Sequence, residues 1–169
     1  MLKIYTDGSA IANRKNTDSG YAYFIPELKI LDGGYIIGTN NIGELLAIQR
    51  SLTLIYQLRN FITKRQLEIV TDSEYSILVL TKNAKLKANV ELIQSIRKLM
   101  KLMEDNGFNI NFKHVGSHGK VEEGQTPEDT AGNKVVDQVA NRMARGKGAY
   151  IIHIDDKNNI GYNFNVTWN

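Results

Sequence analysis

The sequence predicts an α/β domain in which helices flank a mixed β-sheet. Three strand patterns follow one another at the start of the chain, which predicts an antiparallel meander, and strand and helix patterns alternate after them. That alternation predicts parallel strands joined by right-handed crossovers. The 169 residues, 42% of them hydrophobic and 23% charged, suit one compact core. We therefore expect one domain over residues 1–148 and a short C-terminal extension over residues 149–169.

The expected strands of the meander are rich in aromatic and β-branched residues. Residues 2–6 alternate apolar and polar side chains and stop at the turn-forming sequence Asp7-Gly8-Ser9. Residues 21–25 and 30–37 form two further runs, separated by a proline and a few polar residues. Short connections of this kind favour antiparallel pairing between successive strands.

Helical periodicity begins after the third strand. The first expected helix covers residues 42–59, with Asn40-Asn41 as its N-cap and Glu44 in its first turn as the capping-box partner of Asn41. The next elements are a strand over residues 67–71, a short helix over 73–80, an amphipathic helix capped by Asn89 and closed by Asn106-Gly107, and a strand over 110–115.

The end of the chain predicts one more helix and a hairpin. A Gly-rich polar segment over residues 116–132 precedes a helix whose Val136, Val139 and Met143 share one face and which ends near residue 146. Residues 150–168 alternate around a polar turn at residues 156–159. This pattern predicts an additional β-hairpin that packs on the same domain.

The composition excludes several kinds of chemistry. The chain has no cysteine, so it can form neither a disulfide nor a thiolate metal site, and it has no cysteine nucleophile. No apolar run approaches the roughly 20 residues that a membrane span needs, and the first residues do not resemble a signal peptide. We therefore expect a cytoplasmic protein that does not bind a membrane.

Charge is unevenly distributed, although the net charge is only +3. Six basic residues and one acidic residue lie between positions 82 and 101, whereas four acidic residues and no basic one lie between 121 and 129. The basic stretch has two interpretations, a solvated helix face or an electrostatic footprint for phosphate groups. Lys85 and Lys87 are the candidate phosphate contacts under the second interpretation.

Carboxylates occur at four places where an expected element starts or stops, namely Asp7, Glu44, Asp72 and Asp137. Each has a structural explanation on its own, as a turn former, a capping-box partner or an acid one turn into the last helix. Parallel strands would nevertheless bring Asp7 and Asp72 to the same end of the sheet. Because clustered carboxylates repel one another, such a site requires cations, and oxygen ligands alone favour Mg²⁺ or Mn²⁺. Two such ions can drive phosphodiester hydrolysis without an organic cofactor.

Five motifs in order resemble the signatures of type 1 ribonuclease H over about residues 1–145. They are Tyr5-Thr6-Asp7-Gly8-Ser9, residues 39–47, residues 70–75, residues 114–119, and Gly132-Asn133 through Asp137. The resemblance implies a five-stranded sheet in the order 3-2-1-4-5, with only the second strand antiparallel to the others. It also implies a monomeric endonuclease that hydrolyses the RNA strand of RNA–DNA hybrids with two Mg²⁺ ions, or Mn²⁺ as a substitute, leaving 3′-hydroxyl and 5′-phosphate ends.

The same resemblance implies roles for individual residues. The metal ligands would be Asp7, Glu44, Asp72 and Asp137. The positions matching contacts in the minor groove of the hybrid are Asn13, Asn40 and Asn41. Amide side chains suit that task because they both donate to and accept from 2′-hydroxyls. His118, in an expected flexible loop, matches a histidine that assists proton transfer or product departure, and Asn133 matches an asparagine near the scissile phosphate.

The chain also departs from the family pattern. Glu74 stands where several members have glutamine, and an acid there would repel phosphate. Asp137 follows His118 by 19 positions, a longer separation than in many members. The basic stretch is short and lacks tryptophan, and the single tryptophan, Trp168, lies in a tail without a family counterpart. We assign no role to the other two histidines, His114 and His153.

Two other functions are compatible with the same residues. One is another nuclease of this fold, such as a junction resolvase or an integrase-like enzyme, and the other is a hybrid-binding module without catalysis. The asparagine pair favours an RNA-containing duplex, and four acids would not help a pure binder of phosphates. A haloacid-type phosphatase is excluded, since its nucleophilic aspartate would have to occupy the position of Tyr5.

Overall fold

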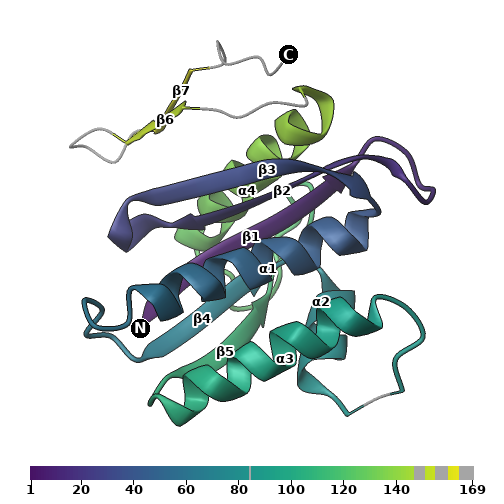
Figure 1. Ribbon diagram of the computed structural model, residues 1–169. Helices are drawn as coiled ribbons and strands as arrows, with labels where there is room; N and C mark the ends of the chain where they lie inside the picture. Colours follow the sequence, from purple (N-terminus) through teal and green to yellow (C-terminus); the bar gives the residue numbers. More distant parts are fainter. Residues whose placement is uncertain (84, 147–150, 155–159, 164–169) are drawn as a thin grey trace.

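The computed structural model describes residues 1–83, 85–146, 151–154 and 160–163, with only the backbone described in the last two ranges. Five strands form one mixed sheet in the order β3-β2-β1-β4-β5 (Figure 1). The strands are β1 (Leu2–Ala10), β2 (Thr17–Ile25), β3 (Ile30–Gly38), β4 (Gln66–Thr71) and β5 (Asn109–His114). Only β2 is antiparallel to the other strands of this sheet, since β1, β4 and β5 pair in parallel. The predicted fold class and strand order are confirmed.

Helices cover both faces of this sheet (Figure 1). On one side lie α1 (Asn40–Gln57), α2 (Glu74–Thr81) and α3 (Val90–Asp105), and on the other lies α4 (Pro127–Gly146). A short 3₁₀-helix, η1 (Pro26–Leu28), joins β2 to β3. Successive residues of a strand point to opposite faces, so Ile69 packs in the core under α1 and α3, whereas Val70 packs under α4.

The first two strands are longer than predicted. The expectation that the first strand stops at Asp7-Gly8-Ser9 is wrong, because these three residues pair with residues 20–22 of β2. Pairing along a neighbouring strand has overridden the local preference of these residues for a turn. Asp7 therefore lies inside β1, three residues before its end, where the strand holds its backbone rigidly.

Two of the predicted helix caps are wrong. The residue that caps α1 is Thr39, whose hydroxyl accepts a hydrogen bond from the Ile42 amide at 3.2 Å. Since the helix starts at Asn40, Glu44 lies in its second turn and forms no capping box with Asn41. Asn89 precedes α3 in a left-handed conformation, with φ of 55°, and its side chain donates to the Tyr75 hydroxyl at 3.1 Å instead of capping the helix.

The last helix starts about two turns earlier than predicted. Gln125 and Thr126 end the preceding loop, Pro127 occupies the first position of α4, and the Thr126 hydroxyl accepts from the Asp129 amide at 3.1 Å. Proline and a reciprocal Thr–Asp pair are strong start signals, and they outweigh the glycines on which the prediction rested. Asp137 is consequently in the third turn of α4, not the first.

The C-terminal hairpin is present, with β6 (Ile151–Ile154) antiparallel to β7 (Ile160–Asn163) in a separate two-stranded sheet. The predicted turn at residues 156–159 and Trp168 lie outside the described residues. Whether the hairpin packs on the main domain stays a prediction. Within the described part of the chain, none of the helices combines the length and the apolar character that crossing a bilayer demands.

Candidate functional site

Three carboxylates meet at one end of the sheet. Asp7 is on β1, Asp72 directly follows β4, and Glu44 is on α1, and one carboxylate oxygen from each lies within 4.8 Å of the others. The parallel register explains the first pair, since Tyr5 lies opposite Val70 and the same offset two residues further brings Asp7 beside Asp72. The sequence-based prediction that parallel strands juxtapose these two acids is therefore fulfilled in the structure.

Glycines let α1 approach β1 closely enough for Glu44 to reach the other two acids. A Cβ atom on Gly8 would lie 2.3 Å from the Glu44 backbone nitrogen, and one on Gly43 would lie 2.6 Å from the Gly20 carbonyl oxygen. Real side chains essentially never make contacts that short, so only glycine fits at both positions. The backbones of helix and strand thus touch, and Glu44 is buried against Asp7.

The fourth acid lines the same cleft from the opposite face of the sheet. A cleft of about 540 Å³ is bordered by Asp7, Glu44 and Asp72 and also by Asp137 from α4. Asp137 is not part of the close trio, but its charge helps to raise the pKa of both Asp7 and Asp72. The structure therefore brings all four predicted carboxylates to one cleft, three in mutual contact range and one at its border.

Mutual repulsion and burial shift the acids toward their protonated forms. Burial is the largest cause that raises the pKa of Asp7 well above its usual range, followed by the charges of Glu44 and Asp72. Burial likewise raises the pKa of Glu44 to about 8, although hydrogen bonds from Asp7 and, to a smaller extent, from Gly8 and Asn40 oppose the shift. The pKa of Asp72 is raised by burial, against a hydrogen bond from the Asn133 side chain. Without a cation, the cluster therefore retains protons near neutral pH.

The donor set fits a divalent cation. Glu44 Oε2 is buried without a hydrogen-bond partner, and an acceptor left in this state costs free energy unless something binds it. The ligand atoms are carboxylate oxygens, with no cysteine and no histidine among the trio, which is the chemistry that Mg²⁺ and Mn²⁺ prefer. A buried acidic trio of this kind is compatible with a metal site.

The predicted asparagines surround the acid cleft at different depths. Asn40 and Asn41 are exposed and line the cleft itself, whereas Asn13 is exposed in a neighbouring hollow that it shares with Asn40. Asn133 is buried and donates to the Gly116 carbonyl oxygen at 3.4 Å as well as to Asp72. Asn40 and Asn41 can therefore contact a ligand in the cleft, Asn13 can contact one that extends into the neighbouring hollow, and Asn133 orients one of the acids.

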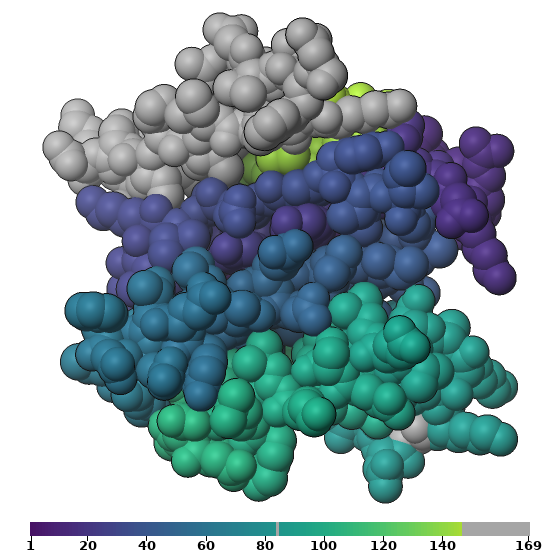
Figure 2. Space-filling view, viewed as in Figure 1, coloured from purple at the N-terminus to yellow at the C-terminus, as the bar shows by residue number. Residues whose placement is uncertain are grey.

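Lys85 and Lys87 do not line the acid cleft. Both are exposed in the loop between α2 and α3. Figure 2 shows this loop (teal) and the turn between β1 and β2 (purple) projecting at the same end of the molecule. The loop that carries the two lysines therefore lies at the same end of the molecule as the turn between β1 and β2, although neither lysine lines the cleft.

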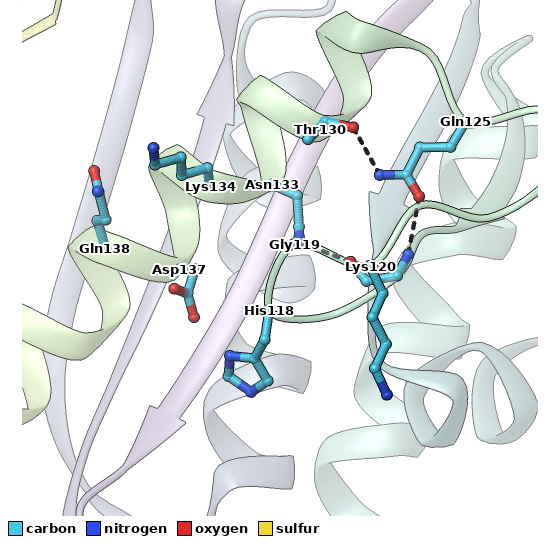
Figure 3. A pocket seen from close by; sticks show the side chains of 10 residues that line it. His118, Gly119, Lys120, Gln125, Thr130, Asn133, Lys134, Asp137 and Gln138 are labelled. Carbon is cyan, nitrogen blue, oxygen red and sulfur yellow. Dashed lines mark hydrogen bonds between the residues drawn. The ribbon is translucent and has the colours of Figure 1, made fainter.

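His118 borders the cleft from the loop that precedes α4. Its ring and the carboxylate of Asp137 lie on the same side of that helix in Figure 3. The backbone of His118 is left-handed, with φ of 51°, and Gly119 follows with φ of 81°. The Lys120 amide donates to the Ser117 carbonyl oxygen at 3.1 Å, so these two left-handed residues form the centre of a tight turn.

His114, to which the sequence assigned no role, contacts the site. Its Nε2 lies 3.1 Å from the Asp72 carbonyl oxygen, and its Nδ1 lies 2.8 Å from a carboxylate oxygen of Glu122. Burial alone would lower the pKa of His114, but these two acceptors raise it overall. Since both partners accept hydrogen bonds, they favour the doubly protonated ring. The motif containing His114 marked the position, but only the fold reveals its partners.

Fold and site together define an α/β enzyme whose acids are gathered at one end of a mixed sheet. The family model of RNase H matches residues 1–145. A ribonuclease H of Tropheryma whipplei (strain Twist) is 35% identical over 126 residues, which cover 67% of this chain and 71% of that protein. The chain therefore belongs to the RNase H family, and the predicted enzyme class is confirmed.

Solved structures agree with this fold. RNase H1 of the archaeon Halobacterium salinarum NRC-1 superposes with a TM-score of 0.57 at 19% identity, covering 85% of this chain and 97% of that one. LC11-RNase H1, isolated from compost by a metagenomic approach, has been solved in complex with an RNA/DNA hybrid. That structure gives a TM-score of 0.58 at 18% identity and covers 84% of this chain and 98% of that one.

Proposed function

We propose that the protein hydrolyses the RNA strand of RNA–DNA hybrids, leaving 3′-hydroxyl and 5′-phosphate ends. One observation carries the proposal: carboxylates from β1, α1 and the end of β4 converge within 4.8 Å beside an open cleft. Family membership and the hybrid bound by LC11-RNase H1 support the substrate. The Asn40-Asn41 pair at the mouth of the cleft supports an RNA-containing duplex over a purely DNA one.

Asp7, Glu44, Asp72 and Asp137 are the residues that would hold two Mg²⁺ ions, with Mn²⁺ as a substitute. Bound ions would lower the pKa of a water molecule and stabilise charge on the phosphodiester. The role of the protein is to keep the carboxylates preformed at the rim of a rigid sheet. Asn133 keeps Asp72 oriented through its hydrogen bond, which also favours the charged form that binds a cation.

The remaining residues of the cleft bind the hybrid and move a proton. Asn40 and Asn41 are placed to donate to and accept from 2′-hydroxyls and base edges. His118, at the border of the cleft beside Asp137, is placed to give a proton to the departing 3′-oxygen. General acid catalysis of this kind contributes roughly 100- to 10,000-fold to a rate.

Asp72→Asn tests the assignment of the acids. We expect hydrolysis of a labelled hybrid to fall at least about 1,000-fold, because metal stabilisation contributes several kcal/mol and about 1.4 kcal/mol corresponds to a factor of ten. Binding of the hybrid, measured by fluorescence anisotropy, should persist. Asp105→Asn, which removes an exposed acid on α3, is the control and should leave both quantities unchanged. Full activity of Asp72→Asn would refute the site.

A substrate panel separates this function from its competitors. Labelled RNA–DNA hybrid, duplex RNA, duplex DNA and a four-way junction should be incubated with the purified chain in the presence and absence of Mg²⁺. We expect cleavage of the hybrid alone, and only with the metal. Preferred cleavage of the junction would instead identify a resolvase, and binding of the hybrid without cleavage would identify a non-catalytic module.

A further inference from the structure

The loop that carries His118 is long but closely hydrogen-bonded. It covers residues 115–126, between β5 and α4. Loops of this length commonly sample several conformations unless their own side chains fix them. If the loop were flexible, as the sequence predicts, His118 would have no defined position relative to the acids. Its contacts show what fixes it.

Gln125 ties three parts of this loop region together. Its side-chain oxygen accepts from the backbone amides of Gly116, at 3.0 Å, and Glu122, at 3.1 Å. Its side-chain nitrogen donates to the Thr130 hydroxyl on α4 at 2.9 Å. The start of the loop, its acidic segment and the last helix are thus joined through one half-buried amide. Figure 3 shows the hydrogen bond from Gln125 to Thr130.

The turn bearing His118 is built on the peptide that Gln125 holds. The Gly116 amide donates to Gln125 and the Gly116 carbonyl oxygen accepts from Asn133, so this residue is fixed on both sides. A Cβ atom on Gly116 would lie 2.2 Å from the Lys120 carbonyl oxygen, which shows that the turn folds back directly onto Gly116. His118 occupies the centre of that turn with a left-handed backbone conformation. Residues other than glycine adopt this conformation only at a cost in free energy.

We propose that Gln125 is a positioning residue that holds the His118 turn beside Asp137 through Gly116, Glu122 and Thr130. The inference rests on the proposed function, in which His118 transfers a proton. The amide suits this position because it offers an acceptor for two backbone donors and a donor for the hydroxyl. Methionine has nearly the same length but can satisfy neither backbone amide. Glutamate keeps the acceptor, and the Thr130 hydroxyl can donate to it.

The kinetic test combines substitutions of the two residues. Gln125→Met should lower kcat for the hybrid about tenfold or more with little change in KM, and Gln125→Glu should stay within about threefold of the wild type. His118→Asn removes the imidazole but keeps a residue that tolerates a positive φ. If Gln125 acts through His118, the double variant should be no slower than His118→Asn alone. Gln57→Met, at the exposed end of α1, is the matched control and should behave as wild type.

A readout independent of activity completes the test. The chain has three histidines, so the ring signals of His118 can be assigned by NMR with one substitution. Gln125→Met should shift or broaden them and speed exchange of the Gly116 and Glu122 amides at least about tenfold, with no such change in Gln57→Met. Three outcomes would each overturn the inference. The first is unchanged amide exchange in Gln125→Met, and the second is a double variant whose loss of kcat equals the product of the two single losses. The third is a His118→Asn variant with the full activity of the wild type. Failure of the proposed function is distinguished by the wild type, which would then not cleave the hybrid, or by Asp72→Asn, which would then keep the full activity of the wild type.

Discussion

Two groups of buried acids in this molecule differ in what surrounds them. Asp7 and Glu44 face other carboxylates, and the pKa of each is raised. Asp129, at the start of α4, is fully buried between two lysines, and its carboxylate oxygens lie 2.7 Å from Lys3 Nζ and 2.7 Å from Lys113 Nζ. Both groups lie in the same domain, yet only Asp129 has lysine side chains from the protein itself to neutralise it.

The surroundings of Asp129 explain the opposite direction of its shift. Burial alone would raise the pKa of Asp129, but hydrogen bonds from Lys113, Lys3 and the Thr126 amide outweigh burial and hold this pKa well below its usual range. The Tyr5 hydroxyl also donates to it at 3.2 Å. A buried acid with its own cations anchors a helix to the sheet, whereas a buried acid without them is suited to bind a cation from solution.

Asp129→Ala should give the largest loss of stability. The substitution removes the shared partner of two lysines and half of the cap of α4, and breaking a buried ion pair typically costs about 3–5 kcal/mol. The free energy of unfolding is measured by urea denaturation. Glu128→Ala, which removes an exposed acid one residue earlier, should change it by less than about 0.5 kcal/mol. A similar small loss for both variants would show that the ion cluster at Asp129 does not anchor the helix.

The acid cleft should show a smaller effect that depends on both pH and metal. The pKa of Glu44 is about 8 in the folded protein and 4.5 as its ordinary value, so the folded state binds more protons than the unfolded chain between these values. Stability of the metal-free protein should therefore fall as the pH rises from about 4.5 to 8. If the cluster binds Mg²⁺ as proposed, the ion binds its deprotonated form, so its stabilising effect should grow over the same range.

The measurement is the free energy of unfolding at pH 5 and pH 8, with EDTA or with Mg²⁺ at one fixed concentration, about 100 times its dissociation constant at pH 8. Mg²⁺ in that excess should add about 2–3 kcal/mol at pH 8 and clearly less at pH 5. Glu44→Gln should reduce both the pH dependence and the metal effect, and Glu128→Gln should alter neither. Equal stabilisation at the two pH values would contradict the raised pKa values of the cleft.

Part of the acid cleft can be predicted from the sequence. The order of strands and helices follows from local patterns, and the parallel register then places Asp72 beside Asp7. The motif around Glu44 predicts its place in the site, although the predicted capping role of this residue is wrong. Local periodicity is sufficient to predict where these acids lie, because their positions depend only on the strand or helix that each residue occupies.

Contacts between distant residues were beyond the sequence patterns. Asp129 belongs to an acidic run in the sequence, but its partner Lys3 lies 126 positions away and no local pattern connects them. The Thr126–Asp129 pair after Gln125 did contain a helix-start signal, and giving it more weight than Gly132 would have placed Asp137 correctly. Gly132 is tolerated inside α4 because it packs on the Tyr5 ring, where a Cβ atom would lie 2.5 Å away.

Substitution of the exposed lysines should have the smallest effect on stability. Lys3 and Lys113 hold a buried acid, whereas Lys85 and Lys87 are exposed, so neutralising the latter pair with glutamine should change the free energy of unfolding by less than about 0.5 kcal/mol. If both contact phosphates, the slope of log affinity for the hybrid against log salt should become shallower by about 0.9 for each lysine. The control is the double substitution Lys98→Gln with Lys101→Gln, which changes the net charge equally on exposed positions of α3. An equal slope for the two double variants would show that Lys85 and Lys87 make no specific phosphate contact, because a general charge effect does not depend on which lysines are removed.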